Sequence, residues 1–396
     1  MIAGYPEGIM GSWATVNGTN AAWYSSSRGV YVNTTPPSYT DIMYRGDTIV
    51  SNETANVRIN LTNATPGNIA LGSATTIISN LLQNYTQPSV VDVSNSTLRV
   101  GGITIGYGTA ALTIGTNANS GTLTAKAAGG NLELVNYSTT NLTINSVIAD
   151  NTSASALYKY GSGLLVLNAA NTYSGATYVN GGVLEVGGAG RLGNGNYGGP
   201  LSVVIGAEFR YNSTLDQTIG AGNSIGGGLM VKDSTSTLTH KVGANFTGPM
   251  TIKNGVWDFG DVHGWEPNWD DPTRRTLTLD GGKLAWSWID SGFWQPFTLG
   301  TGGGILGSVW WGPGGGTFGS YGPILFTNSG PRTLTLDGAR SGSISGPIRV
   351  TREGLFLPAL GNGPGGATTL ANLGYWNLGG TNSYSGGTLV YTGRLT

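Results

Sequence analysis

Short runs in which every second residue is apolar recur along most of this chain. The spacing of three to four residues between apolar positions that marks an amphipathic helix is almost absent. Between residues 165 and 186 these runs read LVL, TYV and LEV. Successive residues of a β-strand point to opposite faces, so each run places two side chains on one face and one on the other. We predict that the core side chains of this segment are Leu165, Leu167, Val179, Leu184 and Val186, and that Tyr178 and Glu185 point outward.

The segments between these runs favour turns. They contain NAAN, SG and NGG, and glycine and asparagine tolerate the positive φ of tight turns. Three short strands and three turns in about 22 residues predict one coil of a parallel β-helix. A single coil cannot bury its inward row alone, so the coils have to stack.

Two distant segments carry nearly the same phrase: NTYSGATYVNGGVLEVG at 171–187 and NSYSGGTLVYTGRL at 382–395. The matching pairs are Asn171 with Asn382, Tyr173 with Tyr384, Gly175 with Gly386, Thr177 with Thr388, Val179 with Val390, and Leu184 with Leu395. RTLTLDG occurs at 275–281 and 332–338, and NFTGPMTIKNGVW at 245–257 is a weaker copy of the first phrase. Similar phrases at unequal spacings predict a solenoid with insertions, not a catalytic domain present twice.

The first phrase, with LLVLN before it and GAGRLGNG after it, resembles the passenger-associated repeat of bacterial autotransporter passengers. SGSISGPI at 341–348 and FTLGTGGGILG at 297–307 resemble other recurring phrases of such surface proteins. The resemblance implies a right-handed parallel β-helix on the outside of a bacterium. It implies no single activity, because passengers include adhesins, biofilm proteins and enzymes.

We therefore predict an all-β fold, a right-handed parallel β-helix, with three regions. Residues 1–50 are predicted to form an irregular N-terminal cap or docking segment, and residues 51–396 the β-helix. A Trp/Gly-rich insertion is predicted at about 257–316, because tryptophan and glycine crowd there.

Composition narrows the function classes. Charged residues make up 10% of the chain, whereas about a quarter is typical. The net charge is −1 without a basic run, so we expect no nucleic-acid partner. Cysteine is absent, which excludes thiolate metal sites, and no apolar stretch is long enough for a membrane helix, so we expect no membrane insertion. MIAGYPEGIM does not resemble a signal peptide, and we expect the chain to be a portion of a longer protein.

One glycine motif is typical of dinucleotide sites. GAGRLG satisfies G-x-G-x-x-G through Gly188, Gly190 and Gly193, and a predicted strand precedes it. A dinucleotide site also needs a helix to follow, because the helix N-terminus binds the pyrophosphate. NGNYGGP follows instead, so we interpret the motif as a structural turn and expect no cofactor.

The acidic residues that could support a polysaccharide lyase or glycoside hydrolase gather in the predicted insertion. They are Asp258, Asp261, Glu266, Asp270 and Asp271, near Arg274 and Arg275. Calcium needs six to eight oxygens converging on one point, and these acids do not recur at coil spacing. His240 and His263 lack spaced partners. We therefore expect neither catalytic residues nor a metal site, and keep the enzyme as an alternative.

Tryptophan is concentrated between residues 257 and 311, at Trp257, Trp265, Trp269, Trp286, Trp288, Trp294, Trp310 and Trp311. One interpretation is that these side chains fill an enlarged section of the solenoid, because aromatic residues bury large areas. The other is a carbohydrate or partner surface, with Trp265, Trp269, Trp286, Trp288 and Trp294 as candidates.

The leading prediction is a secreted structural or adhesive protein of the bacterial cell surface. Trp13, Trp23 and Tyr31 are candidates for docking onto a neighbouring molecule. We expect either head-to-tail association into a fibre or continuation into further coils. A module that binds surface glycans through the tryptophan-rich insertion is the other alternative.

Overall fold

The computed structural model of the chain describes side chains in several ranges. These are 39–62, 67–220, 226–240, 248–259, 276–285, 297–307, 324–325 and 332–336, and further strands are described by their backbone. The chain divides into two units, Met1–Phe209 (unit 1) and Arg210–Thr396 (unit 2).

The first long sheet of unit 1 is parallel throughout, as expected for stacked coils. Its strands, in order, are β5 (Thr40–Ile42), β7 (Asn52–Ile59), β9 (Thr75–Gln83), β11 (Thr97–Ile105), β14 (Asn131–Asn136), β17 (Ala156–Tyr160), β19 (Thr177–Val179) and β22 (Leu201–Val203). The short strands β13 (Thr122–Ala125) and β16 (Val147–Ala149) extend from β11. We call this the first sheet.

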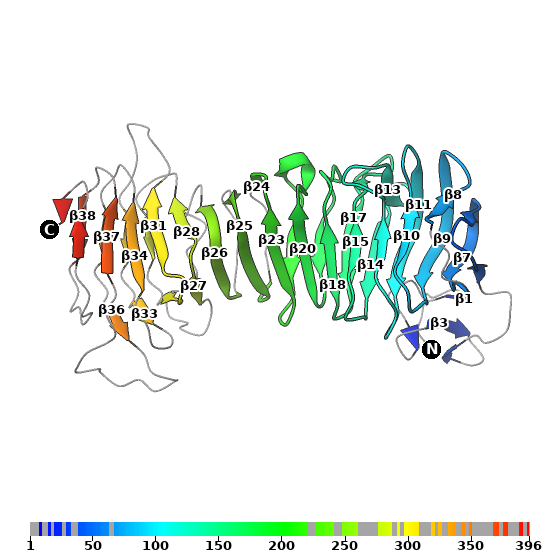
Figure 1. Cartoon of the computed structure of the whole chain (residues 1–396), viewed down its shortest axis with the longest axis horizontal. Coiled ribbons are helices and arrows are strands. Elements are labelled where there is room, and N and C mark those ends of the chain that lie inside the picture. Colours follow the sequence, from blue (N-terminus) through cyan, green and yellow to red (C-terminus); the bar gives the residue numbers. More distant parts are fainter. Residues whose placement is uncertain are drawn as a thin grey trace. The chain divides into compact units, whose positions relative to one another are not determined.

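A second parallel sheet runs beside it in the same unit. It contains β6 (Thr48–Ile49), β8 (Ile69–Leu71), β10 (Ser89–Asp92), β12 (Leu112–Ile114), β15 (Leu142–Ile144), β18 (Leu164–Leu167) and β20 (Val183–Gly188). The chain alternates between the two sheets, so β17 to β20 supply two strands to each (Figure 1). The predicted parallel β-solenoid is therefore confirmed, whereas its right-handed winding stays a prediction.

The predicted inward side chains form the core. Leu165, Leu167, Val179, Leu184 and Val186 are all 0% exposed, and Tyr178 and Glu185 lie on the solvent side with intermediate exposure. The prediction that LVL, TYV and LEV all belong to one coil, however, is wrong. Leu165 pairs with Leu184 across β18 and β20, so these two runs occupy equivalent places in successive coils. Sequence alternation revealed the strands but could not show which of them pair.

The turn glycines of the repeated phrase have distinct structural reasons. Gly182 has a φ of 59°, a value that favours glycine because it has no Cβ. A Cβ at Gly175 would instead collide with the backbone carbonyl of Ser155 in the preceding coil. Glycine thus allows both the tight turn and the close approach of coils.

Four N-terminal strands of unit 1 form a separate antiparallel sheet. They are β1 (Gly8–Ile9), β2 (Thr15–Val16), β3 (Asn20–Ser25) and β4 (Gly29–Val32). Parallel pairing starts at β5 and β6, which pair with β7 and β8. Asp41 of β5 accepts two hydrogen bonds from Arg58 of β7, at 2.6 and 2.8 Å.

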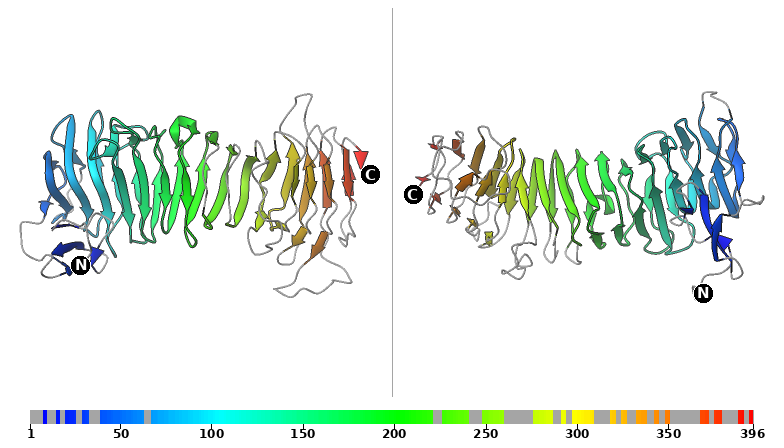
Figure 2. Two further views of the ribbon diagram at one scale, coloured as in Figure 1. Left: turned by 180° about the vertical axis from the view of Figure 1, so that it is seen from behind. Right: turned by 90° about the horizontal axis from the view of Figure 1, so that it is seen from below.

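Unit 2 repeats the parallel arrangement. The strands of its main sheet are β24 (Gln217–Ile219), β25 (Leu229–His240), β26 (Met250–Phe259), β27 (Leu277–Leu279), β28 (Lys283–Trp286), β30 (Phe297–Leu299), β31 (Gly304–Ser308), β33 (Ile324–Phe326), β34 (Thr333–Asp337), β36 (Ile348–Val350), β37 (Ala367–Ala371) and β39 (Thr388–Val390). Another sheet contains β29 (Ser291–Phe293), β32 (Phe318–Ser320), β35 (Gly342–Ile344), β38 (Tyr375–Leu378) and β40 (Arg394–Leu395). The strands of each unit can be followed from the front, from behind and from below (Figures 1 and 2).

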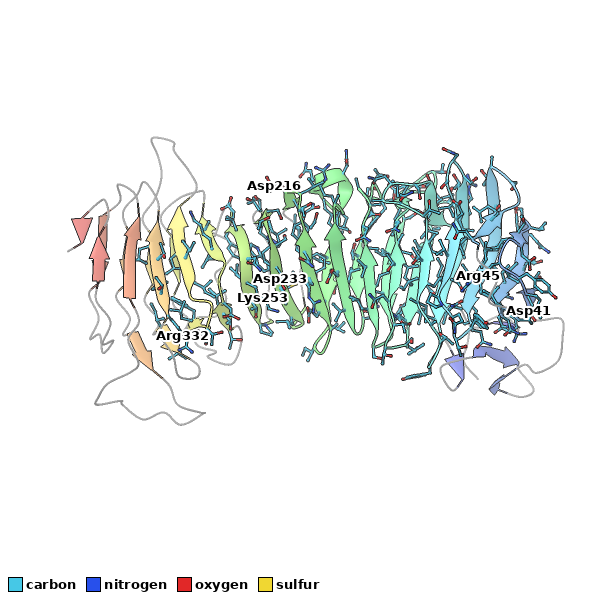
Figure 3. The ribbon with its side chains drawn as sticks, viewed as in Figure 1. Asp41, Arg45, Asp216, Asp233, Lys253 and Arg332 are labelled. Atoms are coloured by element: carbon cyan, nitrogen blue, oxygen red, sulfur yellow. The ribbon has the colours of Figure 1, made fainter. Side chains whose placement is uncertain are left out.

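Contacts inside unit 2 join neighbouring coils. Lys253 of β26 lies beside Asp233 of β25, with 3.7 Å between their charged atoms (Figure 3).

Trp257 is fully buried and stacks on Phe259, with ring centroids 5.6 Å apart. Trp257 is therefore a core residue of unit 2. Whether residues 257–316 form an insertion stays a prediction, because 260–275 and 309–317 lie outside the described residues.

Helical structure is sparse among the described residues. β21 (Asn196–Tyr197) follows a short 3-10 helix at Gly193–Gly195, and β23 (Glu208–Ser213) lies where the two units divide. Among the described residues, no helix has the length and apolar character needed to cross a membrane.

Candidate binding surface

Tyrosine side chains gather on the outer face of the first sheet. Tyr158 and Tyr160 alternate with the inward Lys159 on β17, and Tyr178 lies at the equivalent place one coil later, on β19. The rings of Tyr158 and Tyr178 stack with centroids 4.6 Å apart, and those of Tyr158 and Tyr160 are 6.0 Å apart and nearly parallel. We call these three residues the tyrosine face.

Strand register sets the neighbours of the tyrosine face. Glu133 of β14 aligns with Tyr158 on one side, and Ser202 of β22 aligns with Tyr178 on the other. The outward row therefore reads Glu133, Tyr158, Tyr178, Ser202. A second stacked pair, Tyr107 and Tyr137, with centroids 5.6 Å apart, lies on earlier coils, and Tyr107 is 56% exposed.

The environment of Tyr158 favours the neutral form of its phenol. Partial burial raises the pKa of Tyr158, and the nearby Tyr178 and Glu133 raise it further. A phenol with a raised pKa stays protonated in neutral solution and can donate a hydrogen bond. This surface therefore offers neutral aromatic rings and hydroxyl groups.

Beneath the tyrosine face, Lys159 is fully buried. Its Nζ donates to the carbonyls of Tyr160, Gly161 and Gly181, at 2.9, 2.7 and 2.9 Å. Burial lowers the pKa of Lys159 to about 7. The lysine therefore satisfies turn carbonyls from inside the solenoid and is not available to a ligand on the outer face.

The repeated phrase holds the neighbouring coils together through buried side chains. The side-chain oxygen of Asn171 accepts from the amide of Ile148 at 2.9 Å, and its nitrogen donates to the carbonyls of Ala169 and Arg191. Asn171 thus links the coils before and after its own. This supports the architectural interpretation of the first copy, whereas Asn382 and Tyr384 in the second copy lie outside the described residues.

Two buried tyrosines complete this internal network. The Oγ1 of Thr177 is 2.7 Å from the hydroxyls of both Tyr173 and Tyr197, and Tyr197 donates to the carbonyl of Gly175 at 2.6 Å. Burial raises the pKa of both tyrosines. Tyr173 and Thr177 are therefore structural, whereas Tyr178, directly after Thr177, lies on the solvent side.

Most side chains predicted to form a site lie outside the described residues. This holds for Trp13, Trp265, Trp269, Trp288 and Trp294. Trp23 lies in β3, Tyr31 in β4 and Trp286 in β28, and for these three only the strand is described. Both the docking segment and the tryptophan surface stay predictions.

The residues weighed for catalysis are covered only in part. Asp258 is 6% exposed in β26, and His240 is 3% exposed in β25, where burial lowers its pKa to about 3. The acids at 261, 266, 270 and 271, Arg274, Arg275 and His263 lie outside the described residues. Within the described part of the chain, no group of three acidic or histidine side chains is placed to hold a metal ion.

The glycine motif is a turn, as predicted. Gly188 ends β20 with a φ of 56°, Arg191 bridges to Ala170, and Gly193 begins a three-residue 3-10 helix. This short helix cannot supply the row of N–H groups with which a longer helix binds pyrophosphate. The motif therefore shapes the corner of a coil.

Sequence reasoning missed the tyrosine face. It predicted Tyr178 to point outward but did not consider Tyr158 and Tyr160. The signal was present in the run ALYKY, in which the two tyrosines share one face of a strand. The sequence did not show the strand register that stacks Tyr158 on Tyr178.

Comparisons with known proteins found a family model and a curated protein that are similar to this chain. Residues 157–186 match the family model of the passenger-associated-transport-repeat. In an alignment 297 residues long, which covers 69% of this chain, the sequence is 30% identical to the BmaC autotransporter adhesin of Brucella suis biovar 1. The chain spans 8% of the length of that adhesin. No solved structure matches significantly. The repeat, the identity and the parallel solenoid together make this an autotransporter passenger-like protein.

Proposed function

We propose that this chain is a solenoid module of an adhesive protein exposed on a bacterial surface. The observation that carries the proposal is the passenger-associated-transport-repeat at 157–186, embedded in stacked coils. The likeness to a Brucella autotransporter adhesin supports the adhesive role and the extracellular location. Stacked coils also present long outward faces, which suit binding to extended surfaces.

The proposed role is non-enzymatic. His240 is buried inside unit 2, where it cannot reach an external substrate. The alternative of a polysaccharide lyase or glycoside hydrolase depends chiefly on Asp270 and Asp271. Turnover of an acidic polysaccharide that disappears in Asp270→Ala or Asp271→Ala would favour the enzyme.

The adhesive function can be tested with the full chain coupled to fluorescent beads. Beads are passed under flow over epithelial monolayers, extracellular-matrix proteins and immobilised polysaccharides, with albumin-coated beads as the control. We expect retention on at least one surface several times above the control. Retention equal to that of albumin beads on every surface would contradict the adhesive function.

We also propose that the solenoid associates end to end, with the next subunit of a fibre or with further coils of a longer chain. In the first sheet β5 is the terminal strand, and the open edge of a terminal strand recruits another strand unless it is covered. End-to-end contacts are heterologous and need not close, so they can build fibres. Trp13, Trp23 and Tyr31 form the proposed docking segment.

A further inference from the structure

The stacked rings of the tyrosine face end at Tyr178, and the next residue in the same outward row is the small Ser202. We call this change from a large to a small side chain the step. We propose that this step binds an uncharged polysaccharide chain, with one sugar ring against the open side of the Tyr178 ring. The proposal names a ligand class for the adhesive function proposed above and rests on it. It is carried by the register of β17, β19 and β22 and by the chemistry of the residues around the step.

The two sides of the Tyr178 ring have different neighbours. Tyr158 covers one side, with the ring centroids 4.6 Å apart. On the other side the aligned residue is Ser202, whose short side chain cannot cover an aromatic ring. The stack therefore stops at Tyr178. An uncovered aromatic face carries partial negative charge and attracts the polarised C–H groups of a sugar.

Polar side chains flank the open side. Asn180 directly follows β19 and aligns with Tyr160, since its amide donates to the carbonyl of Lys159 at 2.8 Å. The side chains of Asn180 and Ser202 are partly exposed and make no hydrogen bond to the rest of the described chain. An amide and a hydroxyl beside an aromatic ring are the groups that orient a sugar, because they both donate to and accept from its hydroxyls.

The surface around the step is uncharged. One outward row lies at the N-terminal ends of β17, β19 and β22. Its residues are Ala156, Ala176 and Pro200, which are small and partly exposed. The nearest carboxylate in the row is Glu133, two strands away from Tyr178, or about 10 Å at the usual strand spacing. No lysine or arginine lies in the row to attract an acidic polysaccharide. The chemistry therefore favours a neutral glycan.

The size of the surface favours a narrow ligand over a protein. Four strands about 4.8 Å apart and three outward rows about 7 Å apart cover an area of about 300 Å². A standard protein–protein interface buries about 800 Å² on each partner. A single polysaccharide strand fits the smaller surface, whereas a second copy of this chain would need contacts well beyond the step.

The decisive variant is Ser202→Tyr. A tyrosine at residue 202 extends the stack by one ring and covers the open side of Tyr178, while all natural tyrosines remain. The full chain and the variant are run through native gels containing dextran, galactomannan or xyloglucan, and retardation gives the dissociation constant. We expect one of these neutral polysaccharides to retard the natural chain, and Ser202→Tyr to weaken that binding by about tenfold or more.

Further variants separate binding from folding. Tyr178→Ala should weaken binding similarly, and Tyr178→Phe should retain most of it, because the ring is what contacts the sugar. Tyr44→Ala removes a tyrosine that is 52% exposed elsewhere in unit 1 and should leave binding unchanged. Urea unfolding should show Ser202→Tyr to be at least as stable as the natural chain, because the added ring extends the stack. A loss of binding in this variant is then not explained by unfolding.

Several outcomes would overturn the inference. Equal retardation of Ser202→Tyr and the natural chain would exclude the step, and so would binding only to alginate or polygalacturonate. Self-association that is lost in Ser202→Tyr would assign the step to a second copy of the chain. Bead adhesion that persists in Tyr178→Ala and Ser202→Tyr would leave the adhesive function standing and refute only the glycan step.

Discussion

At the scale of single residues, the solenoid interior contains charged groups in unusual settings. Lys159 and Lys232 are both 0% exposed, and their ammonium groups donate to backbone carbonyls or a serine hydroxyl, not to carboxylates. Burial lowers the pKa of Lys159 to about 7 and that of Lys232 to about 8. These internal hydrogen bonds form at a cost in stability, because a buried ammonium loses its hydration.

This cost makes stability depend on pH. Burial lowers the pKa of Lys159 from 10.5 to about 7, so between these pH values the unfolded chain binds a proton that the folded chain lacks. Stability should therefore rise from about pH 7 towards pH 9.5, and the full penalty should persist below pH 7. The measurement stops at about pH 9.5 because tyrosine titration begins near pH 10 and, with the raised pKa of Tyr158, acts in the opposite direction.

Urea midpoints measured by circular dichroism across this range test the effect. Lys159→Met keeps the length of the side chain and removes the titration, so its midpoint should rise less with pH. Lys126→Met, which removes a lysine on the solvent side, is the matched control and should keep the natural slope. An unchanged slope in Lys159→Met would refute the assignment.

At the scale of the element, residues of the repeated phrase make the contacts that stack neighbouring coils. Asn171 links adjacent coils, Tyr173 and Thr177 fill the corner, and Gly175 allows the backbone to approach Ser155. Tyr178 of the same phrase lies on the solvent side. The same phrase thus supplies both the core of the coil and one ring of the tyrosine face.

Gly175→Ala tests the close approach. Its Cβ would meet the backbone of Ser155, which cannot move without shifting β17, so we expect a loss of about 1–3 kcal/mol in the free energy of unfolding. Gly198→Ala is the control, because a Cβ there has open space around it and its φ is not positive. Equal urea midpoints for both variants would show that the coil tolerates the extra atom.

At the scale of the whole molecule, the antiparallel sheet β1–β4 differs from the described parallel sheets that follow it. Parallel pairing begins at Thr40, the first residue of β5. Residues 1–38 can therefore be removed without cutting a solenoid strand. This boundary allows the docking segment to be tested apart from the fold.

Deletion of residues 1–38 should abolish end-to-end association and leave the β-sheet signal in circular dichroism intact. The physical reason is that the proposed contact uses Trp13, Trp23 and Tyr31, whereas the solenoid starts after them. Sedimentation velocity and electron microscopy would measure the assemblies, with the full chain at equal concentration as reference. Filaments formed equally by both proteins would refute the docking segment, and a monomeric full chain at high concentration would refute the fibre.

The sequence by itself determined the class of fold and the inward face of its strands. Alternation at spacing two identifies Leu165, Leu184 and Val186 as core residues because strand geometry leaves no other choice. Glycine and asparagine marked the corners, and the repeated phrase indicated stacked coils. All of these signals are local, since each depends on residues within a few positions of one another.

The tertiary structure decided which strands pair and what their outward residues meet. Register places Leu165 beside Leu184, Tyr158 beside Tyr178, and Ser202 next in the same row. Tyr158 and Tyr178 are 20 positions apart, and nothing local to either residue indicates the other. Register is set by the length and turns of the whole coil, so the core could be predicted residue by residue, whereas the tyrosine face and its step exist only once the coils are stacked.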